Sequence, residues 1–341
     1  MSVGAKVGLS VNGLTTEIRS RGTWYEAVRD VSFDVHQGET VALVGESGCG
    51  KSLTALSVMS LLPPGVGRVA AGRIALDGEN INGASEPQME KIRGNRIGMV
   101  FQEPMTSLNP VLTVGFQIAE PLMYHRGLSR RAAQAKAVEL MELVRIPSAA
   151  ERAGAYPHQF SGGMRQRVMI AIALACAPKV LIADEPTTAL DVTIQAQVLA
   201  LLAGLQKRAS GCSPERQEKS SGLAVLLITH NLGVVASVAD RVLVMYGGDV
   251  VESAPVRDLF QRPTHPYTSA LLAAMPRADR SSDTVAAIPG QVPTLPEMPA
   301  GCRFQSRCPL VEPRCAELPA LTAIDADGAH HVRCWVRGGV S

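Results

Sequence analysis

The sequence lacks an excess of charge of either sign. It has 33 lysine and arginine residues against 31 aspartate and glutamate residues, a formal net charge of +2 at pH 7. Proteins whose main task is to bind nucleic acid usually carry a strongly basic surface. The near balance of charge therefore argues against nucleic acid as the main partner.

The sequence also lacks a long uninterrupted apolar run. The longest one, from Val168 to Ala183, is broken by Pro178 and Lys179, whereas a membrane-spanning helix needs about 18 or more consecutive apolar residues. The first ten residues contain Lys6 but no apolar core typical of a secretory signal. We therefore expect a protein that does not cross the membrane and stays in the cytoplasm.

The length and the apolar segments of the chain predict an α/β protein of two domains. Its 341 residues, 46% of them hydrophobic, can bury two cores at the usual domain size of about 100 to 200 residues. An apolar run at residues 41–44 ends in a glycine-rich turn and precedes a helical pattern at 53–62. Helical stretches between several further strands predict a mixed sheet with a parallel centre. These buried strands are expected at residues 97–101, 180–183, 224–229 and 242–245.

Three other segments differ in composition from this pattern. Good helix formers fill residues 126–144 and predict a helical subdomain. Residues 207–222 are rich in serine, charged residues and glycine around Pro214, which is typical of an exposed loop. Prolines recur from Pro263 onward, so we expect little regular structure there. Something other than a large core must then hold that tail together.

Residues 45–52 match the phosphate-binding pattern G-x-x-x-x-G-K-[ST] without a mismatch, after a strand and before a helix. The glycines let backbone N–H groups surround phosphate oxygens, and the helix adds its positive N-terminal end. We expect Lys51 to reach the β- and γ-phosphates and Ser52 to give a hydroxyl to Mg²⁺. The chain is therefore predicted to bind ATP and Mg²⁺. The nucleotide-binding residues predicted in this loop are Gly45, Glu46, Ser47, Gly48, Cys49, Gly50, Lys51 and Ser52.

Two adjacent carboxylates, Asp184 and Glu185, follow the apolar strand that begins at Val180. Successive residues of an extended strand point to opposite sides, so the two carboxylates are expected to do different work. Asp184 is the predicted Mg²⁺ ligand. Glu185 is the predicted base that polarises a water molecule attacking the γ-phosphate. Together with the phosphate loop, the pair predicts an ATPase.

The order of the motifs resembles that of the ATP-binding subunits of ABC transporters over residues 1 to about 260. Residues 161–166, Ser-Gly-Gly-Met-Arg-Gln, are similar to the family's signature motif and lie between the phosphate loop and the Asp-Glu pair. Gln102 is placed like the Q-loop glutamine, and His230 follows a strand as the switch histidine does. Residues 189–191, Ala-Leu-Asp, resemble the D-loop.

The resemblance implies a head-to-tail dimer in which two ATP molecules lie between the phosphate loop of one subunit and the signature segment of the other. In that arrangement Ser161, Gly162 and Gly163 contact the nucleotide of the opposite subunit, and a hydroxyl and free N–H groups at a helix N-terminus suit a γ-phosphate. The implied catalytic residues are Glu185, His230, Gln102 and Lys51, and the implied Mg²⁺ ligands are Ser52, Gln102 and Asp184.

Two features depart from the family pattern. Met164 replaces the usual glutamine and Phe160 the usual leucine, so polar contacts at that edge of the nucleotide should differ. The aromatic residue that normally stacks on adenine is not at its usual place either. Trp24 and Tyr25 are the nearest candidates, and they lie a few residues late.

The tail resembles the C-terminal extension of oligopeptide and dipeptide transporter ATPases over about residues 255 to 341. The similarity is carried by Thr264-His265-Pro266-Tyr267, Leu271-Leu272, Gly301-Cys302-Arg303-Phe304 and Arg307-Cys308-Pro309. We therefore divide the chain into a nucleotide-binding domain at 1–260, with its helical subdomain at about 103–175, and a small proline- and cysteine-rich C-terminal extension at 261–341.

Four cysteines of the extension, Cys302, Cys308, Cys315 and Cys334, are separated by gaps of 5, 6 and 18 residues. This is not the paired C-x-x-C spacing of common zinc modules. Four thiolates can hold a [4Fe-4S] cluster or a tetrahedral zinc ion. Some members of the resembled family carry an iron–sulfur cluster here, which favours the cluster, with zinc as the alternative. Four thiols without a ligand are the third reading.

The resemblance implies an ATPase subunit that powers import of di- or oligopeptides from the cytoplasmic face of the cell membrane, as a peripheral protein. Its implied partners are a second ABC ATPase, identical or paralogous, two transmembrane permease subunits and an extracytoplasmic solute-binding protein. Import of nickel or another small solute by the same machinery is an alternative. A DNA-repair or chromosome-organising ATPase is disfavoured, because no long heptad insertion separates Lys51 from Ser161.

Overall fold

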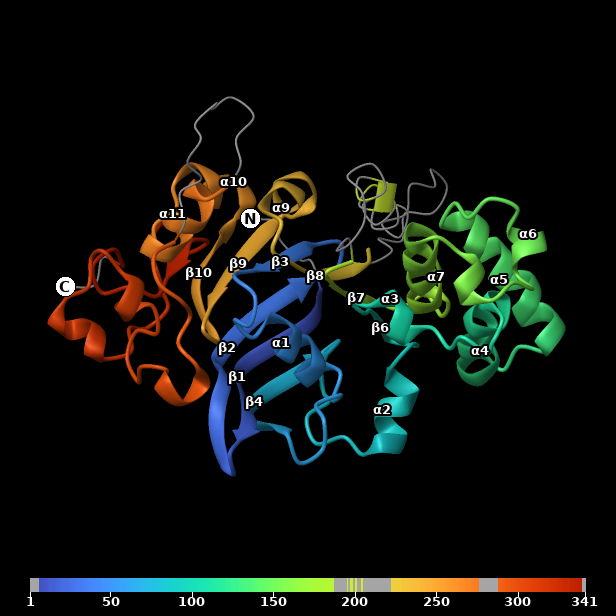
Figure 1. The fold of residues 1–341 in the computed structure, drawn as a ribbon, viewed down its shortest axis with the longest axis horizontal. Coiled ribbons are helices and arrows are strands. Elements are labelled where there is room, and N and C mark those ends of the chain that lie inside the picture. The colour runs from blue at the N-terminus through green and yellow to red at the C-terminus, as the bar shows by residue number, and fades with distance from the viewer. Residues whose placement is uncertain are drawn as a thin grey trace. The chain divides into compact units, whose positions relative to one another are not determined.

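The computed structural model describes residues 6–186, 222–275 and 288–338, with single positions at 195, 197, 198, 200 and 204. The chain folds into two units (Figure 1). The first unit comprises Met1–Leu9, Asp34–Glu39 and Ala75–Ile228, and the second unit comprises Ser10–Phe33, Thr40–Ile74 and Thr229–Ser341. The segment 207–221 and the D-loop candidate at 189–191 lie outside the described residues. The division at residue 260 stays a prediction.

Three parallel strands form the sheet of the first unit. They are β6 (Ile97–Val100), β7 (Val180–Asp184) and β8 (Ala224–Thr229), and Ile97 pairs with Val180, which pairs with Ala224. Every residue of the three strands is buried. A parallel strand buried on both faces needs an almost continuous apolar sequence, which is the pattern that predicted these strands. The prediction is confirmed within one residue at each end.

Helices make up most of the remainder of the first unit. Of these, α4, α5 and α7 pack on one another, and Figure 1 shows them grouped in green. The chain leaves α4 at Gly127, whose φ of +64° suits a helix C-terminus, and enters α5 at Ser129, whose hydroxyl accepts the Ala132 N–H. The helices are α2 (Glu86–Ile92), α3 (Pro104–Ser107), α4 (Val114–Arg126), α5 (Arg130–Leu143), α6 (Ala149–Arg152) and α7 (Gly162–Leu174), and the short strand β5 (Glu79–Asn80) precedes them.

The second unit contains a mixed sheet whose neighbours run in the order β11-β12-β10-β9-β3. Strand β3 is parallel to β9, and β9, β10, β12 and β11 then pair antiparallel. A further set of neighbours runs β2-β1-β4 and was not expected from the sequence. The strands are β1 (Val7–Ser20), β2 (Thr23–His36), β3 (Thr40–Val44), β4 (Gly67–Leu76), β9 (Arg241–Tyr246), β10 (Asp249–Pro255), β11 (Thr322–Ala323) and β12 (His331–Val332).

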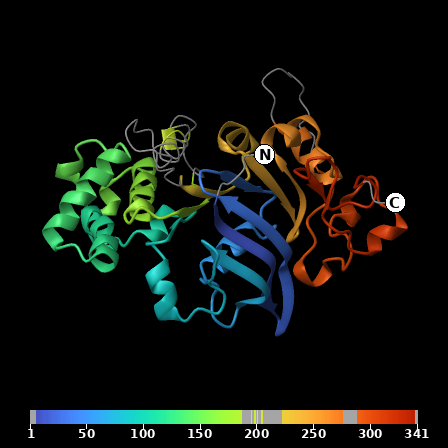
Figure 2. The same cartoon turned by 180° about the vertical axis from the view of Figure 1, so that it is seen from behind.

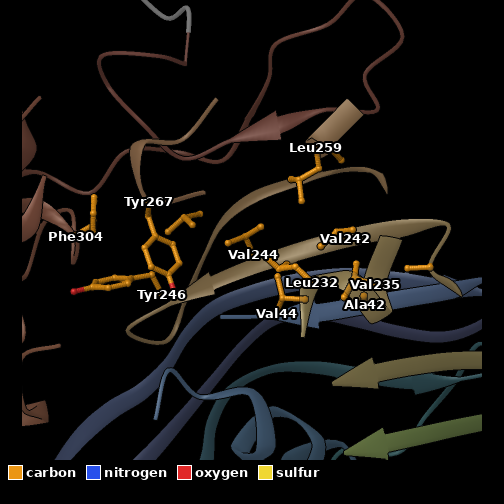
Figure 3. Close-up of a cluster of buried hydrophobic side chains, with 13 residues drawn as sticks. Ala42, Val44, Leu232, Val235, Val242, Val244, Tyr246, Leu259, Tyr267 and Phe304 are labelled. Carbon is orange, nitrogen blue, oxygen red and sulfur yellow. The ribbon is translucent and has the colours of Figure 1, made fainter. Parts of the chain in front are cut away.

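The tail has little regular structure, as predicted, but it does contribute to an apolar core. Tyr267 and Phe304 are fully buried and pack edge-on against Tyr246 of β9, with ring centroids 4.8 and 5.0 Å from the Tyr246 ring. Figure 3 shows these rings at one end of a row of apolar side chains that includes Val242 and Val244. The remaining helices of this unit are α1 (Lys51–Val58), α9 (Leu232–Val238), α10 (Val256–Gln261) and α11 (Pro266–Ala273), and 3-10 turns lie at Leu295–Glu297, Gln305–Arg307 and Pro313–Ala316.

A buried carboxylate fastens two separate pieces of the tail to β10. Glu252, with no exposed surface, accepts the backbone N–H groups of Thr264 and His265, both at 2.8 Å. It also lies 2.7 Å from the ring Nε2 of His330. Such a buried acceptor is stable only because each oxygen is hydrogen-bonded. Two separate tail segments are thus bonded to β10, and Figure 2 shows the tail, in orange and red, beside the gold strands from behind.

The stability of the tail should depend on pH through His265, which is fully buried at the start of α11. Its Nδ1 accepts the Tyr267 N–H at 3.0 Å, and burial lowers the pKa of its ring to about 3. Between pH 6.5 and 3 the unfolded chain binds a proton here that the folded chain does not, so stability falls as pH falls. We expect a loss of about 2 kcal/mol between pH 7 and pH 5.

The matched control is His265→Asn, because asparagine can accept the same N–H at a helix start but does not titrate. The nearby titratable groups, Glu252 and His330, are the same in both proteins. Urea unfolding followed by Trp335 fluorescence at pH 7 and pH 5 measures the effect. An equal loss of stability in both proteins would show that another group carries the pH dependence.

Candidate functional site

The predicted phosphate loop has the backbone of an anion cradle. It connects β3 to α1, and Gly45, Gly48 and Gly50 have φ values of +155°, +78° and +104°. A Cβ on Gly45 would lie 2.1 Å from the carbonyl oxygen of Met245, so only glycine fits there. No side chain caps the N-terminus of α1. The partial positive charge at this end of the helix is therefore not offset by a capping side chain, which suits an anion.

The ammonium group of Lys51 is held over this loop. Its Nζ donates to the carbonyl oxygens of Gly45 and Glu46, both at 2.9 Å, and its side chain is buried. Burial raises the pKa of the neighbouring Cys49 thiol, which keeps that sulfur neutral. Lys51 is thus a fixed positive charge with no ionised sulfur beside it. Ser52 follows in the first turn of α1 and is partly exposed.

The two carboxylates after β7 lie in different surroundings, and one of them contacts the predicted Q-loop glutamine. Asp184 is the last residue of β7 and is 5% exposed. Glu185 is partly exposed, and its φ of +46° ends the extended backbone of the strand. Its carboxylate accepts the Gln102 side-chain N–H at 3.2 Å, and its own N–H donates to Ile228. The left-handed backbone is rare outside glycine and is found at sites where a side chain must be held in one direction.

The signature segment begins α7. The hydroxyl of Ser161 accepts the Met164 N–H at 3.4 Å and caps the helix. Ser161 and Gly162 are exposed and Gly163 is partly exposed, so these groups can be reached by another molecule. Phe160, the departure from leucine, is 2% exposed. Met164, the departure from glutamine, has its sulfur 3.8 Å from the Arg152 guanidinium.

The predicted site residues are distributed over both units. The first unit holds Gln102, Asp184, Glu185 and the signature segment, and the second unit holds the phosphate loop and His230. His230 is exposed and lies between β8 and α9, whose N-terminus is capped by the following residue, Asn231. Trp24, a candidate for stacking on adenine, has the guanidinium of Arg68 over its ring at 4.4 Å. The adenine contact of Trp24 or Tyr25 stays a prediction.

The four cysteines of the extension are neighbours. Burial, and to a smaller extent negative charge on the other three cysteines, raises the pKa of Cys302 to about 11. The Cys302 N–H donates to the Cys315 carbonyl at 2.9 Å, and the Leu310 N–H donates to the Cys308 sulfur at 3.4 Å. Cys334 completes the set. Over the described ranges, however, no three histidine, cysteine, aspartate or glutamate side chains are arranged as metal ligands.

One contact of the phosphate loop was missed by the sequence analysis. Glu46 donates its N–H to the hydroxyl of Tyr267 at 2.9 Å, and its carboxylate accepts two N–H groups from Arg307 at 2.6 and 3.1 Å. Both partners lie more than 200 residues along the chain, and no local pattern connects them to residue 46. The sequence offered one signal of this contact. A carboxylate at Glu46, inside a loop that binds anions, needs a nearby cation to neutralise its charge.

Comparison with known proteins extends these observations to the whole chain. Residues 28–188 match the family model described as ABC transporter, and residues 251–315 match that of the oligopeptide/dipeptide transporter C-terminal region. The oligopeptide transport ATP-binding protein AppD of Bacillus subtilis is 49% identical over 96% of each chain. The dipeptide transport ATP-binding protein DppD of the same organism is 47% identical over 96% of this chain and 94% of its own. The chain belongs to the oligopeptide/dipeptide family of ABC transporter ATP-binding subunits.

Solved structures confirm the ABC ATPase fold of this subunit. The ATP-binding cassette MJ0796, in a dimeric post-hydrolysis state bound to ADP and Pi, is similar with a TM-score of 0.63 and 27% identity, over 73% of this chain and 99% of that one. The transporter component cbiO1 of Clostridium perfringens gives 0.61 and 25%, over 75% and 92%. The predicted α/β class, the family and the ATPase activity are thus confirmed. Within the described residues of this ABC subunit, no helix combines the length and hydropathy of a membrane span.

Proposed function

We propose that this subunit hydrolyses ATP to drive import of di- or oligopeptides through separate transmembrane permease subunits. The observation that carries the proposal is the similarity to AppD and DppD, which runs through both the ATPase core and the extension. Those proteins are named for transport of oligopeptides and dipeptides. We place the subunit at the cytoplasmic face of the cell membrane, where its permease partners lie.

The phosphate loop is the proposed site of ATP. Backbone N–H groups of residues 45–52, other than that of Glu46, which donates to Tyr267, would bind the phosphates together with the buried ammonium of Lys51. Oxygen ligands are those that Mg²⁺ prefers, and the buried carboxylate of Asp184, the hydroxyl of Ser52 and the amide of Gln102 fit that need. When bound, Mg²⁺ would neutralise charge on the β- and γ-phosphates.

Hydrolysis is proposed to depend on Glu185 as the base. Its carboxylate accepts a hydrogen bond from Gln102, so the proposed base and the predicted Q-loop glutamine are in direct contact. Glu185 would take the proton of the attacking water, and His230 would contact the γ-phosphate. The exposed Ser161, Gly162 and Gly163 would contact the nucleotide of a second ATPase subunit, identical or paralogous.

The extension is proposed to hold a metal centre in its four cysteines. Four thiols lie near one another in a segment whose described residues bury few large apolar side chains, which supports a metal centre there. A backbone N–H directed at the Cys308 sulfur is also the kind of contact that stabilises a thiolate. We favour a [4Fe-4S] cluster, with zinc as the alternative. The residues that would hold it are Cys302, Cys308, Cys315 and Cys334.

The function is tested by reconstituting the subunit with its partner ATPase and permease subunits in lipid vesicles. With the extracytoplasmic solute-binding protein added, labelled di- and oligopeptides should accumulate only when ATP is supplied. Peptide should also stimulate ATP hydrolysis. Transport of Ni²⁺ without transport of any peptide would contradict the proposed substrate class. A complex that carries Lys51→Ala measures the background accumulation when the subunit does not bind ATP.

A further inference from the structure

Two described residues of the C-terminal extension, Tyr267 and Arg307, hold the phosphate loop at Glu46. The Tyr267 hydroxyl accepts its backbone N–H at 2.9 Å. Two N–H groups of Arg307 meet its carboxylate, Nη1 with Oε2 at 2.6 Å and Nη2 with Oε1 at 3.1 Å. One residue of the loop is thus fixed both by its main chain and by its side chain.

The arginine contact is specific because Arg307 has no room to move. Its side chain is 4% exposed, and its other N–H groups donate to the carbonyl oxygens of Pro289 and Ile288. Its guanidinium also lies 5.7 Å from the centre of the Tyr246 ring. A paired guanidinium and carboxylate with two parallel hydrogen bonds fixes orientation as well as distance. A lysine cannot reproduce that geometry.

The tyrosine contact is equally constrained. Tyr267 is fully buried, and its ring packs against those of Tyr246 and Phe304 at 4.8 and 5.4 Å (Figure 3). Burial raises the pKa of its hydroxyl, so the group stays neutral. The Tyr267 hydroxyl, which accepts the Glu46 N–H, is therefore held in place by the packing of its ring in the core of the second unit.

From Glu46 the contacts lead directly to the lysine that binds phosphate. The Lys51 ammonium donates to the carbonyl oxygens of Glu46 and Gly45. The Glu46 oxygen belongs to the residue that Tyr267 and Arg307 hold, and the Gly45 oxygen belongs to the peptide unit whose N–H the Tyr267 hydroxyl accepts. A shift of Glu46 would move the carbonyl acceptors that direct Lys51.

We propose that Tyr267 and Arg307 are positioning residues of the ATP site. They hold Glu46 so that the loop N–H groups and Lys51 are already arranged for the phosphates. The inference rests on the proposed role of the loop in binding ATP. Prearrangement reduces the ordering that the nucleotide must impose on the protein. Loss of either contact should therefore weaken nucleotide binding more than it slows hydrolysis of bound ATP.

The test compares Arg307→Ala and Tyr267→Phe with the wild-type full chain by titration with Mg²⁺ and a fluorescent ATP analogue. We expect Kd to rise by roughly 5- to 150-fold for Arg307→Ala, the usual range of coupling between sites. A smaller rise is expected for Tyr267→Phe, which loses one hydrogen bond. Arg262→Ala is the control, because the Arg262 side chain is largely exposed and its guanidinium pairs with Asp258. In steady-state ATPase assays of these variants, KM for ATP should rise by a larger factor than kcat falls.

A double-mutant cycle separates positioning from a general loss of structure. If Arg307 acts through Glu46, adding Arg307→Ala to Glu46→Ala should change Kd little further. Thermal unfolding of each variant is measured alongside, and Tyr267→Phe carries the test should Arg307→Ala not fold. Unchanged Kd in both folded variants, or an equal loss of kcat and affinity, would overturn the inference. If the wild-type chain binds no nucleotide, the proposed function fails instead.

Discussion

Replacing Glu185 with glutamine should lower the turnover of ATP by about 10²- to 10⁴-fold, the usual contribution of a general base. Glutamine has nearly the same shape and can still accept the hydrogen bond from Gln102, but it cannot take a proton from water. Binding of Mg-ATP should be retained, because the phosphate loop and Lys51 are unchanged. Single-turnover release of phosphate and equilibrium nucleotide binding measure the two effects separately.

The control for this variant is Glu142→Gln, which removes an exposed carboxylate from α5 of the same unit. It should hydrolyse ATP at the wild-type rate. Turnover by Glu185→Gln within a few-fold of wild type would exclude Glu185 as the base. Loss of both binding and turnover would instead assign Glu185 to nucleotide binding, since the two constants are affected together when ground-state contacts are lost.

The sequence predicted the buried strands well because burial on both faces leaves a local signal. Residues 97–100 and 180–184 are short apolar runs between helical stretches. Such runs predict buried strands from their own residues alone, without knowledge of the strands that pair with them. The phosphate loop was predictable for a similar reason. Gly45 and Gly50 are required by positive φ and by close contacts within a fixed spacing of the lysine.

The strands β1 and β2 were missed because their turn and sequence depart from common strand signals. A two-residue turn connects them, Arg21-Gly22, with φ values of +49° and +86°. Turns of this kind are normally recognised by Asn-Gly or Asp-Gly. Gly8 and Gly13 also interrupt the apolar alternation of β1, since glycine weakens a strand pattern.

The opposite orientation expected for Asp184 and Glu185 assumed that the strand continued through both residues. The strand ends at Asp184, and Glu185 takes a left-handed backbone instead. The difference in their surroundings follows from that turn and from the contact with Gln102. The contact with Gln102 cannot be predicted from the local sequence, because the hydrogen bond joins residues 83 positions apart. Contacts of Glu46 with the tail are hidden for the same reason.

If the four cysteines hold the proposed metal centre, replacing Cys302 and Cys315 together with serine should abolish metal binding and unfold much of the extension. Metal binding contributes about 10 kcal/mol or more to small thiolate sites at neutral pH, whereas a domain as a whole is stable by only about 5 to 15 kcal/mol. The extension has few large buried side chains apart from Tyr267 and Phe304. Protein purified without oxygen is assayed for iron, sulfide and zinc, and thermal unfolding is followed by Trp335 fluorescence.

Cys176→Ser is the matched control, because Cys176 is a buried cysteine of the first unit and its sulfur hydrogen-bonds the Pro121 carbonyl. It should retain the full metal content. Iron and sulfide in the wild type support the cluster, and stoichiometric zinc in a colourless protein supports the alternative. Wild-type protein without either metal would contradict the proposed centre.

Loss of the proposed metal centre should also weaken nucleotide binding, because Arg307 and Cys308 are adjacent in the sequence. Arg307 precedes Cys308 directly and lies in the 3-10 turn at Gln305–Arg307. If Cys308 is released from a metal, the turn loses its anchor on that side, and the paired hydrogen bonds from Arg307 to Glu46 lose their fixed geometry. The double serine variant should then bind Mg-ATP more weakly than Cys176→Ser. Equal affinity in the two proteins would mean that the aromatic contacts of Phe304 and Tyr246 hold Arg307 in place without the metal.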